Sequence, residues 1–309
     1  MKLGVPDDFD WKYYLEKNKD VASFPLFKSK EGAEKHWIKY GQFENRIYKK
    51  TNISYNTITP IKKQEPVIEK KIVVYTCVSG KYDNLREIKN KHQNVDYICF
   101  TDNFIESKTW EIKEIPKYLE HLENTKKARC LKINPHLFLS QYDISLWVDG
   151  NIEIVGDVFE FIHNTLKENV LYIPKHPQRT CIYDEKDIII KLNKDTENIV
   201  NSQIEKYSFE GYPSNYGLCQ SNIILRKHND PDCVKIDKQW WNELLEFSKR
   251  DQLSFNYVCW KNQDIEIGIL NPNLMCSKYF QHWGHKRNTP TKIPLNYGDK
   301  LNFINGKPV

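Results

Sequence analysis

Long apolar runs, paired cysteines and clustered charge are all missing from this sequence of 309 residues. No stretch of about 18 apolar residues occurs, so no transmembrane segment is expected. Residues 1–30 carry charges throughout and lack the apolar core of a secretory signal. We therefore expect a cytoplasmic protein.

The eight cysteines include no Cys-x-x-Cys pair, which is the spacing typical of zinc sites and redox centres. Several lie inside apolar runs, as Cys99 does between Ile98 and Phe100. We expect buried thiols in a reducing compartment and no disulfide framework.

Basic residues form no block, although the formal net charge is +5 from 46 basic and 41 acidic residues. A nucleic-acid surface needs Lys and Arg clustered on one face, so no nucleic-acid partner is expected. What is present is a hydrophobic share of 39% and an aromatic share of 13%. That composition is enough for a globular core.

The chain divides into three segments by composition. Residues 1–47 predict a small helical module, in which Asp10 and Ser29 are suited to start helices. It resembles a module found in bacterial and large-virus proteins, sometimes beside glycosyltransferases. Because it is too small for a large core of its own, we expect it to serve docking or partner recognition. Residues 48–69 are polar and aperiodic and predict a linker, and residues 70–309 form the main domain.

Strand-like and helix-like patterns alternate along the main domain. This alternation predicts an α/β fold around a mainly parallel sheet. Ligands of such sheets gather at the carboxyl ends of the strands, which are followed here by residues 76–83, 102 and 149–151. The expected strands cover 71–78, 95–101, 110–115, 144–148, 171–173 and 221–225, and the expected helices cover 124–134, 237–249 and 252–260.

The segment Trp147–Asn151 places a carboxylate at the end of an apolar strand. It resembles a degenerate form of the DxD metal-binding motif of GT-A glycosyltransferases, with Asn151 in place of the second Asp. Asp149 and Asn151 are therefore candidate ligands of Mn²⁺ or Mg²⁺, although Asn is a weaker ligand for a hard cation. A plain turn is the structural alternative.

Two basic residues, Arg129 and Lys132, share one face of the helix expected at 124–134. Both are candidates for binding the phosphates of a nucleotide, with Arg129 able to do so in bidentate fashion. Taken alone, the pair fits a solvated basic face better.

The segment Arg250–Asn256 resembles the Asp-Gln…Asn element of retaining GT-A enzymes such as the glycogenin-like family. That resemblance makes Asp251 a ligand of the sugar hydroxyls and places Gln252 near the anomeric carbon. The alternative is that Asp251 only caps the helix that follows it.

A segment near the end of the chain, Gln281–Lys286, contains two histidines. It partly matches the H-x-x-G element of the glycogenin-like family, whose His binds the metal. His282 and His285 are competing candidates for that ligand, and Lys286 is a further candidate for the phosphates.

Seven ordered blocks of the main domain together resemble one family, the glycosyltransferase-like proteins that include plant turgor-regulation and seed-mucilage proteins. The resemblance implies a GT-A fold, which is a Rossmann-like mixed sheet flanked by helices, and transfer of a sugar from a nucleotide-sugar. It leaves the donor sugar, acceptor and linkage open. The matching blocks are 75–85, 96–102, 128–139, 142–154, 175–185, 211–229 and 240–261.

We therefore expect metal-assisted, retaining transfer from a UDP-sugar to a hydroxyl of a glycan or glycoconjugate. Donor-binding candidates, in addition to those above, are Thr76, Gly80, Tyr82, Asp83 and Asp102, and candidates for the acceptor or sugar side are His176, Arg179, Tyr183 and Glu185.

Two other functions remain open. A non-catalytic member of the same fold would bind a sugar or nucleotide only, which the Asn at position 151 favours. A nucleotidyltransferase would need a Gly-rich phosphate loop after the first strand, and Ser79-Gly80-Lys81 is too short for one.

Overall fold

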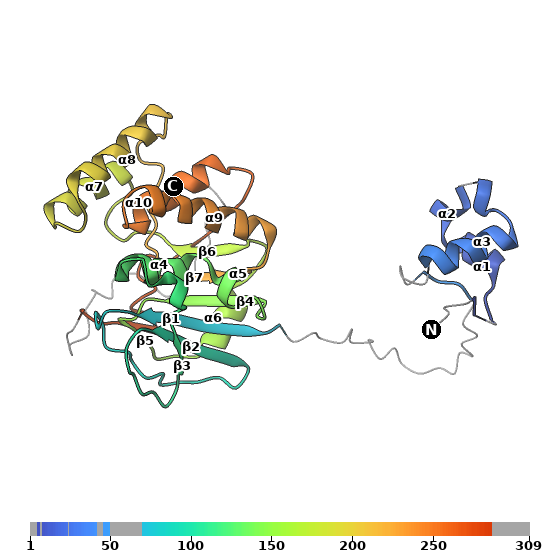
Figure 1. Ribbon diagram of the computed structural model, residues 1–309, viewed down its shortest axis with the longest axis horizontal. Helices are drawn as coiled ribbons and strands as arrows, with labels where there is room; N and C mark the ends of the chain where they lie inside the picture. Colours follow the sequence, from blue (N-terminus) through green and yellow to red (C-terminus); the bar gives the residue numbers. More distant parts are fainter. Residues whose placement is uncertain (1–4, 7, 24, 42–45, 50–69, 286–309) are drawn as a thin grey trace. The chain divides into compact units, whose positions relative to one another are not determined.

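The computed structural model describes residues 5–6, 8–23, 25–41, 46–49 and 70–285 (Figure 1). The chain divides into two compact units, residues 1–67 and 68–309. Within the described residues, no helix is both long enough and apolar enough to cross a membrane.

The first unit is a cluster of short helices whose starts are capped as the sequence predicts. The Asp10 side chain accepts a hydrogen bond from the Tyr13 amide at 3.0 Å, and Ser29 accepts one from the Gly32 amide at 3.1 Å. The unit has a small core of its own, formed by Tyr14, Val21, Ala33 and Trp37. Its elements are α1 (Trp11–Lys17), α2 (Lys19–Ser23), η1 (Pro25–Phe27), α3 (Lys30–His36) and the π-helical turn η2 (Trp37–Gly41).

The second unit is built on a seven-stranded sheet with the order β3-β2-β1-β4-β7-β6-β8. Strands β3, β2, β1 and β4 are parallel, as are β6 and β8, whereas β7 is antiparallel to both of its neighbours. The predicted α/β class with a mixed sheet is thus confirmed. The strands are β1 (Ile72–Val78), β2 (Val95–Thr101), β3 (Glu111–Glu114), β4 (Ile144–Val148), β6 (Leu171–Pro174), β7 (Ile223–Arg226) and β8 (Gly268–Leu270).

Helices cover both faces of this sheet (Figure 1). Alternate residues of β1 point to opposite faces, so that Val73 and Tyr75 join one core cluster and Val74 joins the other. Each buried apolar side chain of this kind contributes roughly 1.5–3 kcal/mol through removal from water. Helices α4 (Asn124–Ile133), α9 (Pro231–Glu246) and α10 (Asp251–Lys261) pack on the first face, and α6 (Val158–Thr165) packs on the second.

The remaining elements connect or extend the sheet. Helices α7 and α8 form a hairpin whose turn, residues 192–196, leads back toward the sheet. Strand β9 pairs with β5 in a separate two-stranded ribbon, which brings residue 282 beside residue 152. These elements are η3 (Lys117–Leu119), α5 (Pro135–Phe138), β5 (Ile152–Ile154), α7 (Ile182–Lys191), α8 (Glu197–Phe209) and β9 (Phe280–His282).

The antiparallel direction of β7 matters for the site. Because β7 runs opposite to β4, the residues that precede β7 lie at the edge where β4 ends. The Asp149 amide accordingly donates a 2.9 Å hydrogen bond to the Asn222 carbonyl. Three further segments, the end of β1, the first half of α4 and the start of α10, reach the same edge.

Candidate functional site

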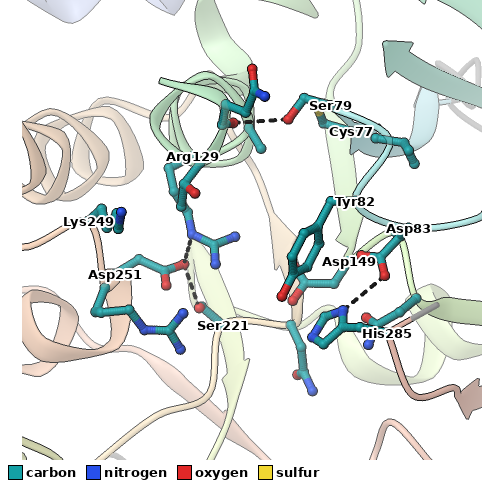
Figure 2. Close-up of a pocket in the computed structure, with 18 of the residues that line it drawn as sticks. Cys77, Ser79, Tyr82, Asp83, Arg129, Asp149, Ser221, Lys249, Asp251 and His285 are labelled. Carbon is teal, nitrogen blue, oxygen red and sulfur yellow. Dashed lines mark hydrogen bonds and ion pairs between the residues drawn. The ribbon is translucent and has the colours of Figure 1, made fainter. Parts of the chain in front are cut away.

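A pocket of about 570 Å³ opens at this edge of the sheet. Figure 2 shows Lys249 and Asp251 on one side of it, Tyr82, Asp83 and His285 on the other, and Arg129 between them. Lining residues come from the segment 77–83, helix α4, position 147, the segments 149–151, 193–194, 220–222 and 249–252, and the later positions 275, 282 and 285.

Asp149 stands at the end of β4 and faces the pocket with one oxygen engaged. Its Oδ1 accepts a hydrogen bond from the indole Nε1 of Trp147 at 2.7 Å and lies 3.4 Å from the Lys132 ammonium. The side chain is 28% exposed. The next residue is Gly150, where a larger side chain would be crowded, because a Cβ there would lie 3.1 Å from Val78 Cγ2. The strand therefore delivers a fixed carboxylate, with Oδ2 directed at no donor of the described residues.

Asp251 is the most heavily bonded carboxylate of the site. Its Oδ2 lies 2.7 Å from Lys132 Nζ and 3.2 Å from Arg129 Nε, and it accepts a 2.7 Å hydrogen bond from Ser221 Oγ. All three contacts engage one oxygen, so within the described residues Oδ1 remains without a donor. Figure 2 shows Arg129 and Ser221 converging on this side chain.

The helix-cap alternative for Asp251 is wrong. Helix α10 begins at Asp251 itself, its N-cap residue is Arg250, and no side chain caps it. The Asp251 carboxylate turns away from the helix N–H groups toward Lys132. The helix start instead holds the carboxylate rigidly, and Gln252 lines the pocket beside it.

Arg129 and Lys132 do share one face of α4, but that face is not solvated. The Lys132 side chain is 0% exposed and that of Arg129 is 17% exposed. The Lys132 ammonium also donates to Ser221 Oγ at 2.9 Å, so Asp149, Asp251 and Ser221 together surround it. The solvated basic face that the sequence alone favoured is therefore wrong.

The charges of Asp251, Arg129 and Lys132 act on one another's pKa values. Burial by itself would raise the pKa of Asp251, but the charges of Arg129 and Lys132, with hydrogen bonds from Lys132 and Ser221, hold that pKa well below its ordinary value. Burial and the neighbouring Arg129 charge lower the pKa of Lys132, against the pull of Asp149 and Asp251. Asp251 is therefore a permanent anion in a largely water-free setting.

The segment after β1 forms the opposite wall of the pocket. It turns through positive φ angles at Gly80 (60°) and Lys81 (55°), a conformation that favours glycine at the first position. The Gly80 amide donates to Asp102 Oδ1 at 2.9 Å, which places Asp102 behind the turn and outside the pocket lining. Gly80, Tyr82 and Asp83 line the pocket, whereas Thr76 is buried within β1.

The four predicted metal ligands approach one another without forming a closed site. Asn151 Nδ2 lies 3.1 Å from His282 Nε2 and donates to the Trp283 carbonyl at 2.9 Å, while His285 Nδ1 lies 2.9 Å from Asp83 Oδ1. Burial and the charge of His285 lower the pKa of His282, which favours the neutral imidazole that a metal needs. No three His, Cys, Asp or Glu side chains converge to hold a cation among the described residues.

His176, Arg179 and Glu185 come together, but neither they nor Tyr183 line this pocket. Arg179 pairs with Glu185, and His176 Nδ1 accepts a 3.0 Å hydrogen bond from the Arg179 amide. Burial and Arg179 lower the pKa of His176 to about 4. Tyr183 donates to the Tyr212 carbonyl at 2.7 Å. The assignment of these residues to the acceptor or sugar side stays a prediction, and Lys286 lies outside the described residues.

Several lining residues were not predicted. Ser221 and Asn222 lie in a block that matched the family, but only the antiparallel course of β7 brings them to the pocket. Lys249 and Arg250 are adjacent in sequence to the predicted site residue Asp251, and this position was the one feature of the sequence that could have indicated them as pocket-lining residues. Asn193 carried no signal in the sequence at all, because the turn that holds it meets the pocket through tertiary folding alone.

Comparisons with known proteins identify a glycosyltransferase-like family. Residues 46–278 match the family described as TOD1/MUCI70, glycosyltransferase-like domain. The probable hexosyltransferase MUCI70 of Arabidopsis thaliana is 23% identical over 215 residues, which cover 60% of this chain and 37% of that protein. The chain thus spans little more than a third of the length of that relative.

Two solved glycosyltransferase structures are also similar. Mouse xyloside xylosyltransferase 1, in its apo form, matches 64% of this chain and 84% of its own with 10% identity and a TM-score of 0.38. The bifunctional glycosyltransferase WbbM, also apo, matches 74% of this chain and 45% of its own with 14% identity and a TM-score of 0.41.

Proposed function

Because this chain belongs to the TOD1/MUCI70 glycosyltransferase-like family, we propose that it transfers a sugar from a UDP-sugar to a hydroxyl of a glycan or glycoconjugate acceptor. One observation carries the proposal. Two carboxylates, Asp149 at the end of β4 and Asp251 at the start of α10, reach the same pocket and are joined by the buried Lys132. This arrangement suits a substrate that carries both a diphosphate and a sugar.

The nucleotide is proposed to lie along the wall formed by Ser79–Asp83. Tyr82 offers an aromatic ring for the base, and Gly80 lets the turn pack closely against Asn124 of α4, because a Cβ there would clash with Asn124 Nδ2. Asp102 supports this turn from behind through its bond to the Gly80 amide. It therefore shapes the nucleotide site indirectly in this proposal, and Thr76 does so as part of the strand.

The diphosphate is proposed to lie near Asp149 with a divalent cation, Mn²⁺ or Mg²⁺. Such a cation would neutralise the charge that builds on the leaving diphosphate. Among the residues that the structure describes, no donor contacts Asp149 Oδ2, and burial favours the neutral imidazole of His282 beside Asn151. These two groups fit a cation that takes its other ligands from the diphosphate. We assign His282 as the histidine ligand because the pairing of β5 with β9 places it beside Asn151, the predicted ligand next to Asp149.

The sugar is proposed to lie between Asp149 and Asp251. As the bond from the anomeric carbon to the diphosphate breaks, positive charge develops on the sugar, and a fixed anion or amide beside it stabilises that charge. Asp251 is pre-oriented by three contacts on Oδ2, which leaves Oδ1 for the sugar hydroxyls. Gln252 adds an amide beside it, and we propose transfer with retention of the anomeric configuration.

A second candidate function is binding of a sugar or nucleotide without transfer. One observation favours it: Asn151 replaces an acidic ligand, and its amide nitrogen is occupied by His282 and Trp283. A cation held by one carboxylate is held more weakly than one held by two.

The experiment that separates the two functions has two stages. A thermal-shift screen of UDP, UDP-glucose, UDP-galactose and GDP-mannose tests binding, because a ligand of the folded state raises its stability by mass action. Release of free UDP from the best donor, with Mn²⁺ and with excess EDTA, then tests transfer. Binding without UDP release under any condition, even with acceptor mixtures, would leave only the binding function.

The cellular compartment in which the protein acts is also a proposal. All eight cysteines are free, which supports a reducing compartment such as the cytoplasm. The module at residues 7–47 is proposed to serve docking or partner recognition.

A further inference from the structure

The last turn of α4 carries Lys132, whose backbone carbonyl is held by two side chains of the core. Helix α4 ends at Ile133, so this carbonyl has no amide of its own helix to accept from. The Tyr75 hydroxyl donates to it at 2.9 Å, and Arg226 Nη1 donates to it at 2.9 Å as well. Tyr75 belongs to β1 and Arg226 to β7, so two strands of the sheet fix the end of the helix.

Arg226 is itself fixed inside the core. Its Nε lies 3.3 Å from Asp237 Oδ1 of α9, and both side chains are 0% exposed. Arg226 Nη1 also donates to the Tyr75 hydroxyl at 3.2 Å. Within the described residues, Nε and Nη2 have no hydrogen-bond partner. The guanidinium group therefore joins β1, β7, α4 and α9 at one point.

This arrangement is a poor source of stability. Burial raises the pKa of Asp237, and the charge of Arg226 offsets only part of that effect. Guanidinium nitrogens that are buried without hydrogen bonds add a further cost. Apolar side chains of similar size at the two positions would often serve the core as well or better. The printed hydrogen bonds of Arg226 go to Tyr75 and to the Lys132 carbonyl, so a role toward Lys132 accounts for it better.

The place of the Lys132 backbone decides where the buried ammonium lies. The ammonium is 2.7 Å from Asp251 Oδ2, 3.4 Å from Asp149 Oδ1 and 2.9 Å from Ser221 Oγ. A shift of the helix end would change these three distances together. We propose that Tyr75 and Arg226 are positioning residues, which hold Lys132 where its ammonium joins the two carboxylates of the pocket. Neither of the two lines the pocket.

The consequence for transfer rests on the proposed function. There, Asp149 and Asp251 must match a diphosphate and a sugar that are bound at the same time. A misplacement of about 1 Å in a reacting group can cost about 100-fold in rate. The nucleotide, in contrast, is proposed to lie along Ser79–Asp83, away from Lys132. Loosening Lys132 should therefore lower kcat and leave the affinity for UDP nearly unchanged.

The first test observes the Lys132 ammonium directly in the full chain. A buried, hydrogen-bonded ammonium exchanges its protons slowly, so it gives a signal in lysine-selective nitrogen–proton NMR spectra, which is assigned by its loss in Lys132→Arg. Tyr75→Phe removes one donor to the Lys132 carbonyl and keeps the ring, and it should shift or broaden this signal. The matched control is Tyr207→Phe, because Tyr207 is also 0% exposed and its hydroxyl donates to Glu243 at 2.7 Å, in the contact of α8 with α9.

A second variant separates positioning from stability. Arg226→Met/Asp237→Leu replaces the buried ion pair with apolar side chains, a change that often leaves stability equal or higher. Thermal unfolding should show that this variant folds, while its Lys132 signal is disturbed as in Tyr75→Phe. If this variant does not fold, Tyr75→Phe decides the question.

The third measurement is UDP release from the donor that the thermal-shift screen selects. Tyr75→Phe should lower kcat by about tenfold and change the Kd for UDP by less than about twofold, whereas Tyr207→Phe should leave both within about twofold. Wild-type protein that releases no UDP would contradict the proposed function, and the NMR signal would still test the positioning of Lys132.

Two results would overturn the inference. One is a Lys132 signal that is the same in Tyr75→Phe as in the wild type. The other is an equal effect of Tyr75→Phe and Tyr207→Phe on the signal and on kcat, which would mean that any lost hydroxyl in this core loosens the site.

Discussion

The Lys132 ammonium lies 2.7 Å from Asp251 Oδ2 in a place where neither side chain is more than 2% exposed. A buried ion pair of this kind loses hydration on both sides and is a poor source of stability by itself. It does fix the positions of its members, and Lys132 also reaches Asp149 at 3.4 Å. We interpret Lys132 as the link that holds the two carboxylates of the pocket at a set separation.

The first prediction concerns Asp251→Asn, which keeps the size of the side chain and removes its charge. On the proposed function, kcat/KM should fall by roughly 100-fold or more, about the 2.7 kcal/mol that one lost transition-state contact typically costs. The measurement is UDP release at saturating and limiting donor, with thermal unfolding to show that the variant folds.

Ser221→Ala is the matched control, because it removes the hydrogen bond that Ser221 Oγ donates to Asp251 Oδ2 and the one that it accepts from Lys132 Nζ, and leaves the charge of Asp251 in place. We expect a smaller loss in kcat/KM than for Asp251→Asn, because Arg129 and Lys132 still hold the carboxylate. A folded Asn variant with full activity would sink the catalytic role of Asp251 and the case for retention.

The second prediction concerns Lys132→Met. Removing one partner of a buried pair leaves Asp251 and Asp149 short of compensation, so the free energy of unfolding should fall by about 3 kcal/mol. Urea denaturation measures it, with Lys126→Met as the control on the same helix. Within the described part of the chain, Lys126 makes one long hydrogen bond of 3.4 Å, to the Leu245 carbonyl, so its loss should cost less than about 1 kcal/mol. Equal losses in the two variants would contradict the linking role of Lys132.

Much of the fold follows from local patterns. The apolar run of β1 predicts a buried strand because both faces of a parallel sheet are covered by helices. Asp10 and Ser29 predict helix starts because their side chains accept hydrogen bonds from backbone amides of the first helical turn. These signals need only a few neighbouring residues, so the α/β class could be predicted from the sequence.

The surroundings of the site depend on distant parts of the chain and could not be predicted in the same way. Lys132 appears as one more surface lysine in the sequence, and only the packing of α4 against β1 and α9, with Asp149, Ser221 and Asp251 around its ammonium, buries it. The long helix α9 begins at Pro231 after the cap residue Asp230, six residues before the predicted start at 237. The hairpin α7–α8 was not predicted, and α7 begins at Ile182, just before the predicted site residues Tyr183 and Glu185.

The third prediction concerns the cation. We expect UDP release to stop in excess EDTA and to return with Mn²⁺, because the diphosphate leaves poorly without neutralisation. His282→Ala should raise the Mn²⁺ concentration for half-maximal activity by about tenfold or more, whereas His285→Ala should change it less, since Asp83 holds His285. Undiminished activity in EDTA would remove the metal and leave its role to Arg129, Lys132 and Lys286.

The fourth prediction concerns the first unit. A chain that begins at Lys70 should fold and retain UDP release within about twofold, because the second unit has its own core and every pocket-lining residue. Thermal unfolding and donor hydrolysis, measured beside the full chain, test this. A folded but inactive shortened chain would show that residues 7–47 take part in transfer.

The last prediction concerns the pH dependence of stability and a group outside the pocket, His228. Its Nε2 lies 2.9 Å from the Leu139 carbonyl, and its Nδ1 is buried without a partner among the described residues. Burial lowers its pKa to about 4; the charges of Arg226 and His136 act in the same direction, against the Leu139 bond and Asp143. The folded state thus keeps His228 neutral, whereas the unfolded chain takes up a proton near pH 6.5. The contribution of His228 to the free energy of unfolding is therefore complete well above pH 6.5 and falls between pH 6.5 and 4, by about 2 kcal/mol from pH 7 to pH 5.

The test variant is His228→Gln, whose amide can still donate a hydrogen bond to the Leu139 carbonyl but cannot titrate in this range. Urea denaturation of both proteins at pH 7, 6 and 5 should show the wild type losing about 2 kcal/mol more than the Gln variant. Parallel pH profiles would mean that His228 is not held neutral by its surroundings.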